Sequence, residues 1–268
     1  MIDKIKQNYL REKFNPDSSD IRIRQLRMVE MIKHLDAICK KYNIHYWLSS
    51  GTCLGAIRHG GFIPWDDDMD IEMFWEDYKK LEKVFNETED YVLQTWKYDK
   101  FYTLPFAKMR DKNTIIYNSL YKHAGIFIDI FIIEKIPTSI SLTSLKFSGI
   151  LQNLYKKVKE NKTRNNKIKF IITKTLVFRL VFPICRLISK IINKFQNSDY
   201  RHTYGCSWVN NIRKKEEICS SIRIDFEGLS LPVPANYDSY LTRIYGNYME
   251  LPKENDIQIQ HADFLKYR

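Results

Sequence analysis

The chain has 268 residues, of which 44% are hydrophobic and 14% aromatic, so it can bury a sizeable core and is not an intrinsically disordered polypeptide. Its net charge of +11 favours anionic partners such as phosphorylated substrates, acidic lipid or nucleic acid. The five cysteines include no CxxC pair, which excludes a zinc ribbon, and their odd number does not suit a disulfide framework.

The location of the protein is predicted from its N-terminus and its apolar runs. The first residues are polar, and no stretch reaches the roughly 18 uninterrupted apolar residues that a membrane-spanning helix needs. Free thiols fit a reducing compartment. We therefore expect a cytoplasmic protein, or one that lies peripherally on the inner face of the cytoplasmic membrane.

The first half of the chain alternates between helical and extended patterns. Apolar residues spaced three and four apart predict a helix over Ile21–Tyr42, and the pattern of Ile44–Leu48 is typical of a strand. A short helix is expected over Thr52–Arg58, and the alternating polarity of Asp68–Met73 predicts a strand. The elements expected next are a helix over Asp77–Phe85 and strands over Tyr91–Tyr98, Leu104–Arg110, Thr114–Tyr117 and Ile126–Ile133.

The second half begins with a basic segment of helical period. It spans residues 143–195, and Pro183 should kink the apolar stretch within it. Between Ser141 and Arg201 there are 14 Lys and Arg residues against 2 acidic ones, a local net charge of +12. Further on, the pattern predicts a strand and turn over Phe226–Pro234 and a helix over residues 237–245 that a glycine ends.

This order of elements predicts an α/β (α+β) fold in which a small mixed sheet carries flanking helices. We expect a single catalytic domain over residues 1–268. Its core is expected over residues 21–137, a basic helical insertion over residues 138–201, and the C-terminal part of the same domain over residues 202–268.

An acidic run carries the strongest chemical signal. Asp66, Asp68 and Asp70 occupy alternate positions, so on a strand their carboxylates would share one face. Like charges at this spacing repel one another unless a cation neutralises them, and oxygen ligands favour Mg²⁺ or Mn²⁺. The alternative, a solvated acidic turn, is disfavoured by the apolar residues before and within the run.

Two other kinds of metal site can be compared with this spacing. An EF-hand loop that began at Asp66 would need Gly and Glu where the chain has Ile71 and Asp77. A glycosyltransferase site of the DxD type fits the acids but leaves the glycine turn upstream unexplained. The acids therefore predict a metal site of another kind.

A glycine turn precedes the acidic run. Ser50, Gly51 and Thr52 join a predicted strand to a predicted helix, and backbone amides at a helix start, with hydroxyls beside them, are suited to bind phosphate. Such turns are common. The acidic strand that follows, with Asp68 only 16 positions after Thr52, makes a phosphate site the preferred interpretation.

Asp129 lies within a predicted strand of otherwise apolar residues. A carboxylate is costly to bury unless it is paired or bound to a metal. A structural, hydrogen-bonded aspartate is one interpretation. We prefer a third metal ligand that also accepts the proton of an incoming hydroxyl.

Four basic side chains are candidates for binding the phosphates of a donor. Lys108 and Arg110 share one face of a predicted strand, and a fixed guanidinium suits a phosphate. Arg58 and His59 stand at the end of the predicted short helix. For all four, an ordinary surface or structural role is the alternative.

These motifs occur together in a known family. The stretch Tyr46–Met73, YWLSSGTCLGAIRHGGFIPWDDDMDIEM, closely resembles the signature block of the LicD proteins. Three further matches follow in the same order, namely LPFAKMRDKNT from Leu104, GIFIDIFII from Gly125 and the segment Phe226–Pro252. The part that matches weakly is the basic segment.

The resemblance implies a nucleotidyltransferase-like fold and the transfer of a substituted phosphate, typically phosphocholine from CDP-choline, to a sugar of a cell-surface glycan. Relatives of the fukutin type use CDP-ribitol and transfer a polyol phosphate. The acids of the family's active site match Asp66, Asp68, Asp70 and Asp129, with the middle pair as metal ligands. Ser50 stands where many members carry glycine, which is a mild departure.

A mechanism follows as a hypothesis. Two Mg²⁺ ions would bridge Asp68, Asp70 and Asp129 to the diphosphate of the donor, and the acceptor would be a glycan or lipid-linked glycan such as lipopolysaccharide, teichoic acid or capsule. Aromatic side chains would hold a choline headgroup through cation–π contacts. The candidates for this aromatic wall are Trp65, Trp96, Tyr98 and Tyr102.

Three other functions remain open. These are transfer of a polyol phosphate from CDP-ribitol or CDP-glycerol, transfer of a nucleoside monophosphate from a nucleoside triphosphate, and non-enzymatic binding of a membrane. The basic segment is either an insertion that packs on the core or an interfacial element that contacts anionic lipid. The chain has no motif for nucleic-acid binding, so nucleic acid is not an expected partner.

Overall fold

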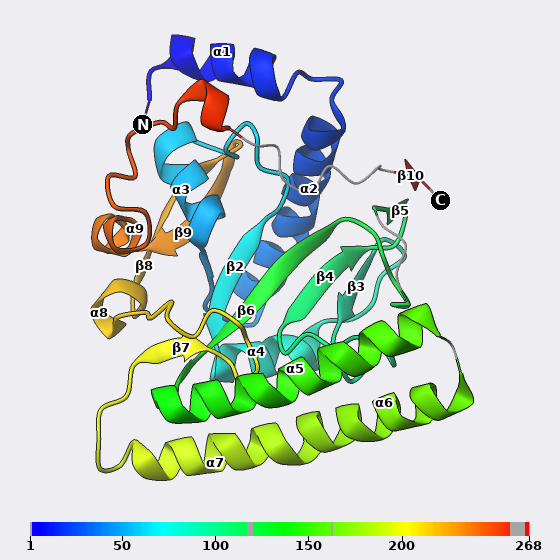
Figure 1. The fold of residues 1–268 in the computed structure, drawn as a ribbon. Helices are drawn as coiled ribbons and strands as arrows, with labels where there is room; N and C mark the ends of the chain where they lie inside the picture. The colour runs from blue at the N-terminus through cyan, green and yellow to red at the C-terminus, as the bar shows by residue number, and fades with distance from the viewer. Residues whose placement is uncertain (1, 117–119, 162, 258–265, 268) are drawn as a thin grey trace.

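The computed structural model describes residues 2–116, 120–161, 163–257 and 266–267, and its elements are labelled in Figure 1. The α-helices are α1 (Lys4–Phe14), α2 (Asp20–Lys41), α3 (Ser50–His59), α4 (Trp75–Val84), α5 (Thr138–Glu160), α6 (Arg164–Leu176), α7 (Phe182–Ile192), α8 (Lys215–Ile218) and α9 (Tyr237–Tyr245). A π-helical turn, η1 (Val177–Val181), joins α6 to α7, and a 3-10 turn, η2 (Glu254–Asp256), follows α9. The strands are β1 (Trp47–Leu48), β2 (Asp70–Phe74), β3 (Tyr91–Gln94), β4 (Ala107–Asp111), β5 (Thr114–Ile115), β6 (Phe127–Lys135), β7 (Tyr200–His202), β8 (Ser221–Phe226), β9 (Leu229–Pro234) and β10 (Lys266–Tyr267).

A mixed sheet forms the centre of the molecule, with strand order β1-β2-β6-β4-β3 and with β7 paired to the last part of β6. β2 and β6 are parallel, and the other neighbouring pairs of this sheet are antiparallel. β6 lies between two neighbours, and its apolar residues Ile128, Ile130 and Ile132 are buried, as expected of a central strand. The mixed sheet with its flanking helices confirms the predicted α/β fold class.

The helix α2 covers one face of this sheet. Its residues Met28, Met31, Ile32 and Leu35 recur at helical spacing and are almost completely buried in the main core, together with the apolar side chains of β2 and β6. Side chains alternate along a strand, so the opposite face of β2 and β6 carries the acids Asp70, Glu72 and Asp129 together with the aromatic Phe127 and Phe131. That face holds the candidate site.

Several predicted elements are confirmed with small shifts at their ends. The helix predicted over Ile21–Tyr42 is α2, and the helix predicted over residues 237–245 is α9, which ends at Gly246 with a left-handed φ of 66°. β3 and β4 are shorter than predicted, whereas β6 extends two residues beyond the predicted end, to Lys135. β3 ends at Gln94 because the segment that begins at Thr95 turns back. Tyr117, at the end of one predicted strand, lies outside the described residues.

Two predictions near the acidic run were wrong in detail. The strand expected from Asp68 begins at Asp70, so Asp66 and Asp68 precede it in an irregular segment and do not alternate along a strand. The cause is a turn in which the Asp66 amide donates to the Ile63 carbonyl at 3.0 Å. The short helix begins at Ser50 and not at Thr52.

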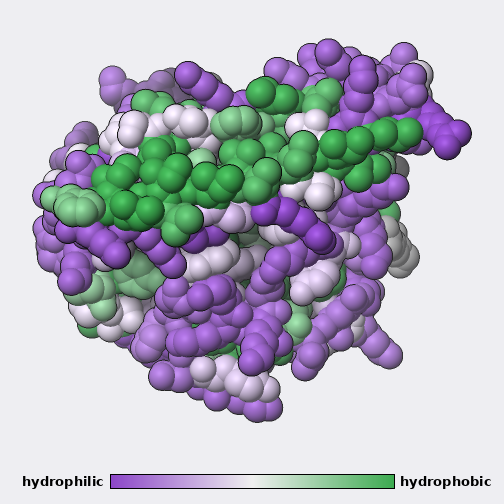
Figure 2. Space-filling view, turned by 90° about the horizontal axis from the view of Figure 1, so that it is seen from below, coloured by the Kyte–Doolittle hydropathy of each residue, from purple (hydrophilic) through white to green (hydrophobic). Residues whose placement is uncertain are grey.

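The basic segment forms α5, α6, η1 and α7, which lie across the end of the sheet where β6 leaves it (Figure 1). The break expected at Pro183 takes the form of the π turn η1 just before it. Proline has no amide hydrogen to donate, so hydrogen bonding must change in the preceding turn, and the Phe182 amide donates to the Val177 carbonyl five residues earlier. Figure 2 shows that the outer face of this layer carries a stripe of apolar residues.

Candidate active site

Three neighbouring strands, β2, β6 and β4, bring two acidic residues and one basic residue into a row. Asp70 at the start of β2 is in register with Asp129 on β6, and Asp129 is in register with Lys108 on β4. Residues in register on adjacent strands point to the same face of a sheet. The Lys108 Nζ lies 2.5 Å from the Asp129 Oδ1, and the side chains are 8% and 12% exposed.

Burial and charge act on this ion pair together. Burial lowers the pKa of Lys108, although Asp129 opposes the shift. Burial likewise raises the pKa of Asp129 above its ordinary value, against the effect of Lys108. The Lys108 Nζ also lies 3.4 Å from the centre of the Phe127 ring, a cation–π contact that holds the ammonium in place.

The acids of the run crowd against this row. Burial and the neighbouring Asp68 raise the pKa of Asp66 well above its usual range. Burial, Asp68 and Asp129 do the same to the pKa of Asp70, although Lys108 opposes the shift. Without a cation, these carboxyl groups must share protons to relieve their repulsion.

The residues of the glycine turn position these carboxylates. The Asp70 amide donates to the Thr52 Oγ1 at 2.8 Å, so Thr52 fixes the start of β2. A Cβ atom at Gly51 would lie 3.0 Å from the Asp66 Oδ2, so only glycine leaves full room for that carboxylate. Ser50 has a left-handed φ of 46°, and its amide donates to the Tyr240 hydroxyl at 3.1 Å. That conformation favours glycine, which explains why many members of the family resembled by this sequence carry glycine where this chain has Ser50.

Two cavities meet at Asp68 and Asp70. The strand-face cavity has a volume of about 350 Å³ and is lined by Arg24, Asp67, Asp68, Asp70, Lys108, Ile116, Ile126, Phe127, Asp129, Phe131 and Trp208. The helix-start cavity has a volume of about 410 Å³ and is lined by Ser50, Gly51, Leu54, Ile63, Trp65, Asp66, Asp68, Asp70, Tyr245, Pro252, Asp256 and Ile257. Asp129 and Lys108 face only the first cavity, whereas Ser50 and Gly51 face only the second.

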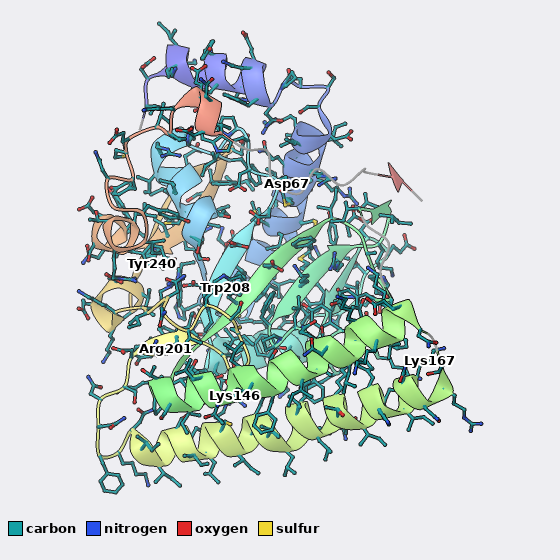
Figure 3. The ribbon with its side chains drawn as sticks, viewed as in Figure 1. Asp67, Lys146, Lys167, Arg201, Trp208 and Tyr240 are labelled. Atoms are coloured by element: carbon teal, nitrogen blue, oxygen red, sulfur yellow. The ribbon has the colours of Figure 1, made fainter. Side chains whose placement is uncertain are left out.

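Sequence reasoning missed several residues of the strand-face cavity, among them an ion pair and a tryptophan. Arg24 on α2 forms a buried ion pair with Asp67 at 2.8 Å, and Asp67 was not among the predicted site residues. Trp208 comes from the loop after β7 and packs edge-on against Phe131, with ring centres 5.3 Å apart. Figure 3 shows that Asp67 and Trp208 both lie well away from Lys167 on α6. Arg24 could have been found from the sequence, because it is a basic residue on the predicted amphipathic helix, near the apolar positions that face the core. The sequence around Trp208 contains no comparable signal of a role in the site.

Three of the predicted phosphate-binding side chains lie away from both cavities. Arg58 donates to the carbonyls of Tyr248 and Glu250 at 2.9 and 3.1 Å. Burial and the neighbouring Arg58 lower the pKa of His59 to about 3, and its Nδ1 lies 2.6 Å from the Gln7 Oε1. These contacts join α3 to segments near both ends of the chain.

Arg110 is the third, and it is fully buried. Its Nε donates to the Gln94 Oε1 at 2.8 Å, and its guanidinium donates to the Gly125 carbonyl at 2.7 Å. These contacts join β4 to the neighbouring segments of the sheet. Although Arg110 shares a strand face with Lys108, it does not line the strand-face cavity.

The aromatic wall also differs from the prediction. Trp65 lines the helix-start cavity, but the Trp96 ring stacks on Phe178 at 4.9 Å, in the contact with the basic segment. Tyr102 is buried and donates to the Phe106 carbonyl, and Tyr98 is 61% exposed away from the carboxylates. The aromatic residues of the strand-face cavity are Phe127, Phe131 and Trp208.

A divalent cation fits the chemistry of this site. Oxygen donors converge where Asp68 and Asp70 face both cavities, and burial together with the neighbouring carboxylates raises the pKa values of Asp66 and Asp70. Within the described part of the chain, no group of three or more His, Cys, Asp or Glu side chains is placed to hold a metal ion, so the protein would supply two carboxylates at most. The Asp129 carboxylate is engaged by Lys108, which leaves Asp68 and Asp70 as the better ligand pair.

Comparison with known proteins agrees with the resemblance found in the sequence. Residues 43–148 match the family described as LicD/FKTN/FKRP, nucleotidyltransferase domain. The lipopolysaccharide cholinephosphotransferase LicD of Haemophilus influenzae is 31% identical over 264 residues, which cover 90% of this chain and 96% of that protein. The mouse ribitol-5-phosphate transferase FKTN is 34% identical over 71 residues, 26% of this chain and 15% of that protein. The human ribitol 5-phosphate transferase FKRP is 37% identical over 62 residues, 23% of this chain and 12% of that protein.

The similarity to the bacterial relative extends over almost the whole of both chains and includes the glycine turn, the acidic run and Asp129 within the matched family domain. A purely non-enzymatic, membrane-binding function is therefore set aside. The chain belongs to the LicD family and is a LicD-type phosphotransferase with a nucleotidyltransferase domain.

Proposed function

We propose that this chain transfers phosphocholine from CDP-choline to a sugar hydroxyl of a cell-surface glycan, such as lipopolysaccharide, teichoic acid or capsule, and that it needs Mg²⁺ or Mn²⁺. The observation that carries the proposal is the 31% identity to a cholinephosphotransferase over 90% of this chain. The two cavities that meet at Asp68 and Asp70 support it, because one can hold the donor while the other holds the acceptor.

The donor would occupy the helix-start cavity. There the start of α3 offers backbone amides near Gly51, and the Ser50 hydroxyl lies beside them. In this arrangement the transferred phosphate lies against Asp68 and Asp70, and the CMP leaving group remains in the helix-start cavity. A metal ion held by Asp68 and Asp70 would neutralise the charge of the donor's diphosphate.

The acceptor hydroxyl would enter through the strand-face cavity. Asp129 accepts its proton as the new bond forms between the acceptor oxygen and the choline-bearing phosphorus, and the bond from that phosphorus to CMP breaks. The ammonium of Lys108, 2.5 Å from Asp129, positions this carboxylate and can contact an oxygen of the transferred phosphate. In this proposal Asp129 acts as the base, and Asp68 and Asp70 are the metal ligands.

The headgroup of the donor, choline or a polyol, distinguishes two candidate transfer reactions. Trp208, Phe131 and Phe127 offer aromatic faces to a quaternary ammonium, each contact being worth about 0.5–2 kcal/mol. The similarity to FKTN and FKRP favours a second candidate, transfer of a polyol phosphate from CDP-ribitol or CDP-glycerol. A polyol carries no positive charge, so Trp208→Ala should weaken binding of CDP-choline about threefold to thirtyfold and leave CDP-ribitol almost unaffected.

Calorimetry with CDP-choline, CDP-ribitol, CDP-glycerol and CTP, each with Mg²⁺, tests the donor. We expect selective binding of CDP-choline that disappears with EDTA and in Asp68→Asn. Binding of CTP alone, with pyrophosphate and not CMP as the released product, would replace the proposal with nucleotidyl transfer. Selective binding of CDP-ribitol or CDP-glycerol would keep the mechanism and change the transferred group.

A further inference from the structure

An apolar stripe runs along the outer side of the helical layer formed by α6, η1 and α7. Its members recur every three or four residues, so they share one side of the helix. All are large apolar side chains that are at least 39% exposed, namely Ile168, Ile172, Leu176, Leu180, Ile184, Leu187, Ile188, Ile191 and Phe195. At 1.5 Å per residue the stripe is about 40 Å long.

The exposure of the stripe is not caused by poor packing of the helix. The other side of the same helix is firmly attached to the rest of the protein. Phe178 stacks on Trp96 with ring centres 4.9 Å apart, and the Lys174 Nζ donates to the Asp99 carbonyl at 2.6 Å. Arg186 forms an ion pair with Glu134 on β6 at 2.5 Å. The attachment fixes the helix so that the stripe faces outward along its full length.

The charge beside the stripe has a single sign. Residues 161–198 contain nine Lys and Arg residues and no Asp or Glu. Arg179, Lys190 and Lys194 are exposed and stand within one helical turn of stripe residues. Figure 2 shows hydrophilic surface along one long side of the stripe, and along the other side a band of intermediate and apolar residues with hydrophilic surface beyond it. Apolar area flanked by cations is complementary to a bilayer surface that contains anionic lipid.

We propose that α6, η1 and α7 dock this stripe in the surface of an anionic membrane, with the helix lying in the plane of the interface. No helix among the described residues is long and apolar enough to cross a membrane, so the proposed contact is peripheral. A second copy of the chain is a poorer occupant, because pairing two such stripes would bring the exposed Arg179, Lys190 and Lys194 of both copies together, and residues 161–198 contain no acid to separate them.

The proposed surface lies apart from the catalytic residues. The carboxylates stand at the amino ends of β2 and β6, whereas α5 to α7 follow the carboxyl end of β6, six residues beyond Asp129. At about 3.3 Å per residue this is about 20 Å, and Figure 3 shows Asp67 at the far end of the sheet from Lys146 on α5 and Lys167 on α6. Docking can therefore be tested independently of the proposed transfer reaction.

Flotation of the full chain with vesicles tests the proposal. One set of vesicles contains phosphatidylcholine alone, and the other contains phosphatidylcholine with phosphatidylglycerol. We expect the wild-type chain to float mainly with the anionic vesicles and to be released by high salt. Leu187→Gln, at a stripe position 59% exposed, should reduce the partition coefficient about tenfold. Leu26→Gln is the matched control, an exposed helical leucine (48%) on α2, and should float like wild type.

Charge is tested separately. The double variant Arg179→Glu and Lys190→Glu should abolish the preference for anionic vesicles, and its thermal melting curve should match that of the wild type because both side chains are exposed. Equal flotation of wild type and Leu187→Gln, or no flotation at all, would overturn the proposal. A dimer in solution that Leu187→Gln dissociates would overturn it too, by assigning the stripe to a second copy.

Discussion

Asp70 and Glu72 lie two residues apart on β2, and they experience opposite electrostatic environments. Glu72 is fully buried and receives the Arg213 guanidinium at 2.5 Å, the His202 Nε2 at 3.1 Å and the Trp47 Nε1 at 3.0 Å. Burial alone would raise the pKa of Glu72, but Arg213 and His202 lower it below its usual range. Asp70 has other carboxylates around it, and its pKa is raised.

The difference separates a structural acid, Glu72, from Asp70, which we propose to be functional. The protein supplies its own cation to Glu72, which then joins β2 to β7 and to the loop before α8. At Asp70, burial and the carboxylates of Asp68 and Asp129 outweigh the effect of Lys108, and we propose that a bound cation compensates this charge. Burial of a carboxylate therefore indicates function only when the chain leaves its charge uncompensated.

The largest effect expected from this comparison is on activity. Asp70→Asn should lower the rate of transfer on the order of a thousandfold or more, because the site loses a ligand for positive charge at the reacting phosphate. The variant should be at least as stable as wild type, since it relieves repulsion among the carboxylates. Release of CMP from the donor and a thermal melting curve measure the two quantities. A variant that retains most of its activity would end the assignment of Asp70 to catalysis.

Glu72→Gln should act on stability instead. It removes the charge that balances the buried Arg213 and should lower the free energy of unfolding by about 3–5 kcal/mol, measured by urea denaturation. Glu217→Gln is the control. Glu217 is also buried, but its partner Arg243 is 24% exposed and can be hydrated, so the loss should be smaller. Equal losses in the two variants would show that burial of the cation is not decisive.

The effect of Asp70 on the free energy of unfolding should change with pH, and the direction of that change identifies a carboxyl group whose pKa is raised by folding. Its pKa is raised in the folded protein, so its stabilising contribution is present below the unfolded pKa of about 3.9 and is lost as the pH rises through the folded pKa. In EDTA, Asp70→Asn should therefore gain stability relative to wild type above about pH 4, by up to about 1.4 kcal/mol per pH unit. Urea denaturation over a pH series measures this gain. Asp17→Asn, at a side chain that is 98% exposed, should show no such trend.

The smallest effect concerns the space beside Asp66. In Gly51→Ala the new Cβ would lie 3.0 Å from the Asp66 Oδ2, and the carboxylate must shift by a few tenths of an ångström. We expect kcat/KM to fall about tenfold with little change in melting temperature. In Gly149→Ala, on α5, the added Cβ meets nothing within 4 Å and should raise stability by about 0.5–1 kcal/mol without changing kcat/KM. A loss of kcat/KM in both variants would contradict this explanation.

The sequence predicted elements that local patterns determine. The spacing of apolar residues located α2, and Gly246 marked the end of α9, because both signals lie within the element itself. The mixed sheet and the family followed from the order of motifs. The start of β2 was misplaced, because it depends on a turn at Ile63 and on a hydrogen bond from the Asp129 amide to the Met69 carbonyl, which no local pattern records.

The partners of the site residues were beyond local reasoning for the same reason. Lys108 was expected to bind phosphate, and its ion pair with Asp129 depends on the register of two strands. Arg110 shares the strand face of Lys108 but turns to Gln94 and Gly125. A periodic pattern assigns a residue to a face, and only the packed neighbours decide whether that residue binds a ligand or supports the fold.

In the proposed reaction, the two cavities that share Asp68 and Asp70 would also determine the stereochemistry at phosphorus. A donor held on one side of these carboxylates and an acceptor that enters on the other side place the entering and leaving oxygens on opposite sides of the phosphorus atom. Transfer in a single displacement inverts the configuration at that atom. A donor made chiral at this phosphorus with a sulfur substituent should therefore yield one product diastereomer, of inverted configuration, and no enzyme-bound phosphocholine should accumulate.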